Sequence, residues 1–129
     1  ETMKIILKSE NEDNPFEVGS LGRIDSAPNC NYCKTVVQQN KDLYIKNYLA
    51  NEDWKDNSAI DLDIISYCGL IIKWADGEIF GTICIHDSQE REFGEEIKKQ
   101  LQFAKSLIEN SLEIFYQNQL NNNLRYYYS

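Results

Sequence analysis

The sequence has no apolar run near the roughly 20 residues that a membrane-spanning helix requires. Positive charge is also scarce, since 13 Lys and Arg residues stand against 21 Asp and Glu, a formal net charge of -8. An acidic surface repels nucleic-acid phosphates and anionic lipid headgroups, so we expect neither as a partner. What is present fits one globular domain with a core, because 42% of the 129 residues are hydrophobic.

Histidine is almost absent, since His86 is the only one. A single histidine gives no Ser-His-Asp or Cys-His arrangement that spacing could support, so we expect no catalytic residues. A metal site is not expected either, because closed zinc sites need four ligands and the cysteines show no convergent spacing with His86. The sequence assigns no cofactor.

Four cysteines are present, and no secretory signal accompanies them. We therefore expect all four, including Cys68 and Cys84, to be reduced thiols in the cytoplasm. Cys30 and Cys33 form a Cys-x-x-Cys motif ahead of a predicted helix, and redox proteins use this arrangement because a helix N-terminus lowers a thiol pKa. A thiol redox protein or redox sensor built on Cys30 and Cys33 is an alternative hypothesis for the function.

The first half of the chain reads as short elements separated by polar loops. Alternation of apolar and polar residues predicts two strands that pair as a hairpin, then a short helix capped by Asn29 or Asn31, then a third strand. A long polar segment, 47–63, follows and carries one large apolar residue, Trp54. Segments of this length inside a domain often form lids or pocket walls. The predicted elements are strands over 3–8, 16–21 and 43–46 and a helix over 32–39.

The centre of the chain carries the strongest hairpin signal. Two β-rich runs flank Asp76-Gly77, and an Asp-Gly pair favours a tight hairpin turn. If Asp76 and Gly77 are the two turn residues, Ala75 lies opposite Glu78 and the register of both strands follows. One face of the hairpin is then almost wholly apolar and is expected to carry the C-terminal helix. The residues of this face are Cys68, Leu70, Ile72, Trp74, Ile79, Gly81, Ile83 and Ile85.

The opposite face of the predicted hairpin mixes apolar groups with hydroxyl, thiol, imidazole and ammonium groups. Mixed surfaces of this kind form small-molecule pockets, and the alternative is that the 47–63 segment simply covers the face. A pocket would lie between this face and that segment, with Trp54 as part of the lid. The candidate ligand contacts are Trp54, Tyr67, Ile71, Lys73, Phe80, Thr82, Cys84 and His86.

An amphipathic helix is predicted from about Glu95 to the end of the chain. Its apolar residues form two stripes, which make a face wider than contact with one sheet needs. More than 30 helical residues would extend about 45 Å or more, so the end should project and pair with a second copy. The alternative is a frayed tail beyond Gln119, because asparagine is a poor helix former. The first stripe is Ile97, Leu101, Ala104, Ile108, Leu112 and Phe115; the second is Phe103, Leu107 and Ile114.

These motifs, in this order, resemble the GAF sensory domain family. The stretches 67–72 and 79–87 on either side of Asp76-Gly77 are similar to that family's central hairpin, a Tyr-x-Gly-apolar strand followed by a Gly-Thr-apolar-Cys strand that ends in Asp. Arg91-Glu92-Phe93 resembles its connection to the last helix. Tyr32-Cys33 and the residues that follow resemble its Phe/Tyr-Cys helix. The resemblance covers roughly residues 3 to 116.

The resemblance implies an α+β fold of the GAF- and PAS-like type, with three layers. A central antiparallel sheet of about five to six strands carries the long C-terminal helix on one face. A layer of loops and short helices lies on the other face and holds any ligand. We expect a GAF-like domain over 1–116 and a helical connector or frayed tail over 117–129.

The resemblance also implies a function. GAF domains usually precede histidine kinase, diguanylate cyclase or phosphodiesterase outputs and signal through dimerised helices. The chain is therefore expected to be a non-catalytic, cytoplasmic sensor module in a homodimer, linked to an output domain. A ligand-free dimerisation module is a further alternative. The sequence lacks the signatures of cyclic-nucleotide, bilin and methionine-sulfoxide reductase types, so it does not identify a ligand.

Overall fold

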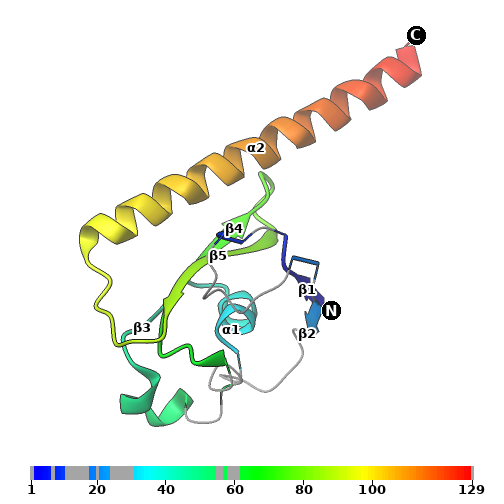
Figure 1. The fold of residues 1–129 in the computed structure, drawn as a ribbon. Helices are drawn as coiled ribbons and strands as arrows, with labels where there is room; N and C mark the ends of the chain where they lie inside the picture. The colour runs from blue at the N-terminus through cyan, green and yellow to red at the C-terminus, as the bar shows by residue number, and fades with distance from the viewer. Residues whose placement is uncertain are drawn as a thin grey trace.

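The structure, a computed structural model, describes residues 2–6, 8–10, 18–19, 21–23, 31–54, 57 and 62–128. Its centre is an antiparallel sheet in the order β3-β4-β5, with α2 on one side and α1 on the other (Figure 1). This arrangement confirms the predicted α+β class. The elements are β1 (Thr2–Lys4), β2 (Leu21–Arg23), α1 (Tyr32–Gln39), β3 (Leu43–Ile45), two 3-10 turns (Tyr48–Ala50 and Glu52–Trp54), β4 (Ser66–Lys73), β5 (Ile79–Asp87) and α2 (Glu95–Tyr128).

The central sheet has fewer strands than predicted. Among the described residues, β1 and β2 pair only with each other, with Thr2 opposite Arg23, and form a separate two-stranded sheet. The prediction that the first two strands pair is confirmed. Their bounds differ from the predicted 3–8 and 16–21, because the strands are Thr2–Lys4 and Leu21–Arg23; residues 7, 11–17 and 20 lie outside the described part.

The hairpin turn differs from the predicted two-residue form. The Trp74 N–H donates to the Glu78 carbonyl at 2.8 Å, and the Gly77 N–H donates to the Trp74 carbonyl at 2.9 Å. The loop therefore contains three residues, Ala75-Asp76-Gly77, and Trp74 rather than Ala75 pairs with Glu78. Gly77 has φ +90, a left-handed conformation that glycine adopts without strain.

A β-bulge at Phe80 restores the expected register beyond the turn. Lys73 lies opposite Ile79, whereas Ile72 lies opposite Gly81, so Phe80 is the extra residue on β5. From there to Tyr67 opposite His86 the pairing is the predicted one. The bulge puts Ile79 and Phe80 on the faces opposite to those predicted, because the extra residue breaks the alternation of side chains along β5.

Ile79 packs against the α1-side cluster rather than on the α2 side. The Phe80 ring instead lies edge-on to Trp74, with ring centroids 5.2 Å apart, and Trp74 in turn contacts Phe115 of α2 at 6.5 Å. The prediction that Phe80 shares the mixed face is therefore wrong.

Away from the bulge, β4 and β5 divide their side chains between two clusters as predicted. On the α2 side, Cys68 and Leu70 are fully buried and pack with Phe93 and Leu101. Ile83, Ile85 and Ile97 complete this cluster. On the α1 side, the buried residues are Tyr32, Val36, Ile45, Trp54, Ile64, Tyr67 and Ile71.

Two carboxylates accept hydrogen bonds from backbone N–H groups of β4 that lie beyond the end of β3. β3 pairs only with Tyr67 to Gly69, so later N–H groups on that edge need other acceptors. Asp42 accepts from the Ile71 N–H at 3.0 Å, and Glu109 of α2 accepts from the Lys73 N–H at 2.9 Å. These contacts close an otherwise open strand edge and tie the bend of the hairpin to α2.

α2 is one helix of 34 residues, about 51 Å at 1.5 Å per residue. Its C-terminal half extends past the hairpin bend (Figure 1). The prediction of a helix continuing beyond Gln119 is confirmed through Tyr128. The predicted division of the chain at residue 116 stays a prediction, since α2 crosses that position without a break.

Candidate functional site

The candidate site lies where the first turn of α1 packs on the sheet. Asn31 caps the helix: its side-chain oxygen accepts from the Lys34 N–H at 3.2 Å, and its carbonyl accepts from the Thr35 hydroxyl at 2.7 Å. The predicted bounds of α1 are confirmed, with Asn31 as the cap; Asn29 lies outside the described residues. This start places Tyr32 and Cys33 in the first turn, against β4 and β5.

Three aromatic rings form the floor of the site. Tyr32 stacks on Tyr67 with centroids 4.8 Å apart and an interplanar angle of 22°, and its other neighbour is Trp54 at 4.9 Å. The Tyr32 hydroxyl donates to the Ile64 carbonyl at 3.3 Å, and burial raises the pKa of Tyr32 to about 12. Trp54, predicted as a lid residue, is 4% exposed and is part of this packed cluster.

Gly69 makes room for the Tyr67 ring. The two residues lie on the same face of β4, and the ring folds over the glycine so closely that a Cβ there would overlap the Tyr67 hydroxyl and ring. Tyr67 is 2% exposed, so it has no space to move away. The Tyr-x-Gly pair thus fixes where the Tyr67 hydroxyl points.

That hydroxyl lies beside two thiols. The Cys33 Sγ is 3.1 Å from the Tyr67 oxygen and 3.7 Å from the Cys84 Sγ. Hydrogen bonds from Cys84 and Tyr67 lower the pKa of the Cys33 thiol, against the opposing effect of burial. The pKa of Cys84 is raised well above the usual thiol range, because of its bond to Cys33 and its burial. One thiol of the pair is therefore set to ionise before the other.

The remaining predicted site residues lie around this centre in different ways. Ile71 is buried in the same cluster, and a hydrogen bond from Thr82 also lowers the pKa of Cys33. His86 is half-buried, and its burial lowers its pKa. Lys73 is half-buried at the bend, beyond the bulge. The structure thus brings together Trp54, Tyr67, Ile71, Thr82 and Cys84, but not Phe80.

The sequence motif Cys30-x-x-Cys33 did not point to the thiol that Cys33 contacts. Cys30 lies outside the described residues, and the near neighbour of Cys33 is Cys84, 51 positions later. The one signal available was that Cys84 belongs to the mixed face of the hairpin, on the side opposite α2. Spacing alone could not place α1 over that face.

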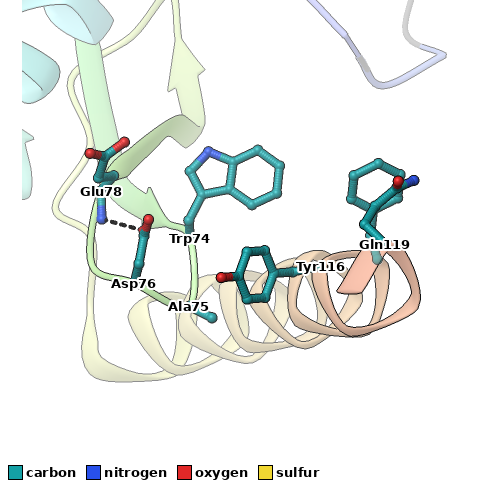
Figure 2. Close-up of a pocket in the computed structure, with 7 residues that line it drawn as sticks. Trp74, Ala75, Asp76, Glu78, Tyr116 and Gln119 are labelled. Carbon is teal, nitrogen blue, oxygen red and sulfur yellow. Dashed lines mark hydrogen bonds between the residues drawn. The ribbon is translucent and has the colours of Figure 1, made fainter. Parts of the chain in front are cut away.

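A second feature is a cleft on the α2 side of the hairpin bend. It has a volume of about 270 Å³ and lies between the three-residue loop and the middle of α2. Figure 2 shows Trp74 and Tyr116 facing one another across it, with the Glu78 N–H bonded to the Asp76 carboxylate at 3.0 Å at the rim. Its lining residues are Trp74, Ala75, Asp76, Glu78, Phe115, Tyr116 and Gln119. This cleft is distinct from the predicted pocket, which lies on the other face.

The described residues show neither a metal-binding cluster nor a membrane-spanning helix. Within them, no group of three or more His, Cys, Asp or Glu side chains is arranged to hold a metal ion. No helix in the described part of the chain is both long and apolar enough to span a bilayer.

The sequence profile of the GAF domain matches residues 7–112, most of the chain. The chain belongs to the GAF domain family. A search of curated proteins by sequence found no match.

Solved structures agree with this GAF fold. The GAF domain of an Acinetobacter phosphoenolpyruvate-protein phosphotransferase superposes with a TM-score of 0.59 at 14% identity, covering 84% of this chain and 60% of that one. The reduced form of fRMsr from Staphylococcus aureus gives 0.54 at 20% identity, covering 74% and 62%. At these identities the likeness shows the fold alone, and this GAF domain spans about three fifths of the length of either chain.

The GAF motifs noted in the sequence have structural roles here. Asp87, at the end of β5, forms an ion pair with Arg91, and hydrogen bonding to Arg91 lowers the pKa of Asp87. The Arg91 N–H donates to the Lys46 carbonyl at 3.1 Å, which ties the connection to the end of β3. Phe93 then enters the cluster beneath α2. Together these contacts set the direction in which α2 leaves the sheet.

Proposed function

We propose that this GAF domain is a non-catalytic, cytoplasmic signal-input module. It forms a homodimer through α2 and passes its signal to a covalently linked output domain, of the histidine kinase or diguanylate cyclase type. The observation that carries the proposal is the second apolar stripe of α2. Phe103, Leu107 and Ile114 are 67%, 53% and 63% exposed, although Ile97 and Leu101 of the first stripe already pack on the sheet.

The geometry of α2 favours a second copy of the same helix as the partner for this stripe. Solvent-exposed aromatic and branched side chains repeated along one helix face are typical of helix pairing. Apolar side chains are also exposed on the part of α2 that extends beyond the hairpin bend, where Leu120 is 40% exposed. A parallel pair of such helices would leave both α1-side faces open and would direct both C-termini toward the same output.

In the input step, a small molecule binds on the α1 side of the sheet, where Thr82 and His86 supply polar groups beside the aromatic floor. Binding shifts the equilibrium between two arrangements of the domain to the extent that the ligand prefers one of them. The ligand-free dimerisation module is the competing proposal. Thermal unfolding with nucleotides, amino acids and haem separates the two, because a ligand of the native state raises Tm in proportion to its concentration and affinity.

The dimer is tested by adding charge to the second stripe. We expect the wild-type chain to sediment at twice its monomer mass of 15.0 kDa, and the double variant Leu107→Glu, Ile114→Glu to sediment as a monomer. Glutamates facing each other across a helix pair lose apolar contact and repel one another. Because both side chains are exposed in the single chain, the fold itself should be unaffected, which circular dichroism can verify.

The matched control for this experiment is Gln102→Glu, Ser106→Glu. It adds the same two charges to exposed positions of the same helix that lie outside the stripe, so we expect it to remain dimeric. A monomeric wild-type chain at tens of micromolar, or a double stripe variant that stays dimeric, would refute pairing through this face.

A further inference from the structure

The two thiols beneath α1 are positioned for more than packing. Cys33 lies in the first turn of α1 and Cys84 in β5, and their sulfurs are in contact at 3.7 Å. A disulfide bond is about 2.05 Å long, so side-chain rotation and a small shift of α1 would be enough to form one. We propose that Cys33 and Cys84 are a redox pair that a hydroperoxide oxidises to a disulfide linking α1 to β5.

Cys33 is the attacking thiol of the pair. Its sulfur lies 3.1 Å from the Tyr67 hydroxyl and 3.7 Å from the Cys84 sulfur, and once Cys33 is ionised, Tyr67, Thr82 and Cys84 are the donors to it. These donors stabilise the thiolate, which is the form that reacts with peroxides. The first turn of a helix adds its own partial positive charge. Both Cys33 and Cys84 are half-buried, which favours a small neutral oxidant such as hydrogen peroxide over a bulky one.

The chemistry balances with the hydroperoxide as the oxidant. The Cys33 thiolate attacks the terminal peroxide oxygen, an S–O bond forms, the O–O bond breaks, and the leaving alkoxide takes a proton to become an alcohol. Cys33 is now a sulfenic acid, oxidised by two electrons. Cys84 then attacks the Cys33 sulfur, the S–S bond forms, and hydroxide leaves and combines with the Cys84 proton as water. Hydrogen peroxide therefore yields two molecules of water per disulfide.

Cys68, in the same sheet, is expected to be unreactive toward peroxide. It is fully buried on the α2 side among Leu70 and Leu101, and burial raises its pKa to about 11. Neither the position nor the chemistry of Cys68 fits the reaction. The chain thus contains its own internal control for selective oxidation.

The bridge would act on the α1 side of the sheet. It would replace the contact between Cys33 and Tyr67 and fix α1 on β5, closing a loop across 51 positions. The redox pair goes beyond the proposed signal-input function, because its oxidation depends neither on a small-molecule ligand nor on pairing of α2. It could nevertheless serve as an input, since α1 and α2 pack on opposite faces of the same two strands.

The test uses the whole chain with Cys30→Ser, which removes the alternative partner in the Cys-x-x-Cys motif. The reduced protein is treated with hydrogen peroxide, blocked, and digested with trypsin without reductant. We expect one disulfide-linked product that joins residues 24–34 to residues 74–91, with the 56–73 peptide carrying a free Cys68. We also expect Tm to rise by on the order of 10 °C, because a long loop is closed, and to fall back with dithiothreitol.

Matched variants make the outcome decisive. Cys84→Ser should leave Cys33 as a sulfenic acid without a crosslink, and Cys68→Ala should oxidise like the parent. Tyr67→Phe should slow the peroxide reaction about tenfold, because one hydrogen bond to the thiolate is lost. The proposal is overturned if the crosslink forms only when Cys30 is present, if it involves Cys68, or if peroxide yields none. Fragment-ion mapping of the oxidised wild-type chain distinguishes Cys30 from Cys33 should a variant fold poorly.

Discussion

Replacing Leu70 with alanine is expected to destabilise the domain by about 3–4 kcal/mol, within the range for a leucine removed from a packed core. Leu70 is fully buried in the middle of β4, where it packs with Phe93 and Leu101 beneath α2. The truncation leaves a cavity between a central strand and a helix, and neither can collapse far, because β4 is bonded on both sides.

The measurement for Leu70→Ala is urea unfolding, in which the midpoint should fall while the slope is unchanged. Leu49→Ala is the matched control: Leu49 is 69% exposed, so the same substitution there should cost less than about 0.5 kcal/mol. If the two variants lose similar stability, Leu70 does not lie in the α2 interface. That result would contradict the division of the hairpin into two faces.

Gly69→Ala is expected to cost about 2–3 kcal/mol, although a single methyl group is added. The new Cβ would overlap the hydroxyl and ring of Tyr67. That ring cannot move cheaply, since it is buried, stacked on Tyr32 and in contact with the Cys33 thiol. Elsewhere in a strand, glycine to alanine is usually neutral or slightly stabilising, so the sign of the effect is itself informative.

Two comparisons isolate the cause of the Gly69 effect. Gly81→Ala adds the same methyl group in β5, where no atom lies within 4 Å, and should change stability by less than about 0.5 kcal/mol. In a Tyr67→Ala background, Gly69→Ala should lose most of its cost, because the two sites are coupled through the ring. An unchanged cost in that background would show that the Tyr67 ring is not what excludes the methyl group.

The sequence predicted those parts of the fold that depend on local chemistry. The bounds of α1 follow from the Asn31 cap and the apolar residues behind it, and both are found in the structure. The two faces of β4 follow from strict alternation, which separates Leu70 from Ile71 whatever the rest of the chain does. The long α2 follows from its apolar stripes and its acidic first turn.

The errors arose where one local signal allows two geometries. An Asp-Gly pair suits both a two-residue turn and a three-residue loop that ends in a left-handed glycine, and here the second occurs at Gly77. Nothing in the sequence marks the bulge at Phe80 that compensates for the longer loop. A single inserted residue therefore exchanged the faces of Ile79 and Phe80.

The candidate site was predicted only in part, because it depends on contacts between distant segments. Tyr67, Ile71, Thr82 and Cys84 share a face by alternation, and this could be seen from the hairpin alone. Cys33 joins them only because α1 packs across that face, and no spacing rule connects residues 51 positions apart. The more visible Cys30-Cys33 motif pairs Cys33 with a residue outside the described part of the chain and gives no indication of its contact with Cys84.

The β4–β5 hairpin separates an α2-binding face from a face with reactive and polar groups beneath α1. Methyl NOE spectroscopy on the reduced protein tests it most directly. We predict NOEs that connect Leu70 with Ile97 or Leu101, and NOEs that connect Ile71 with Val36 or Ile45. NOEs from Leu70 to Val36, or a complete lack of NOEs from Leu70 to α2, would contradict the claim.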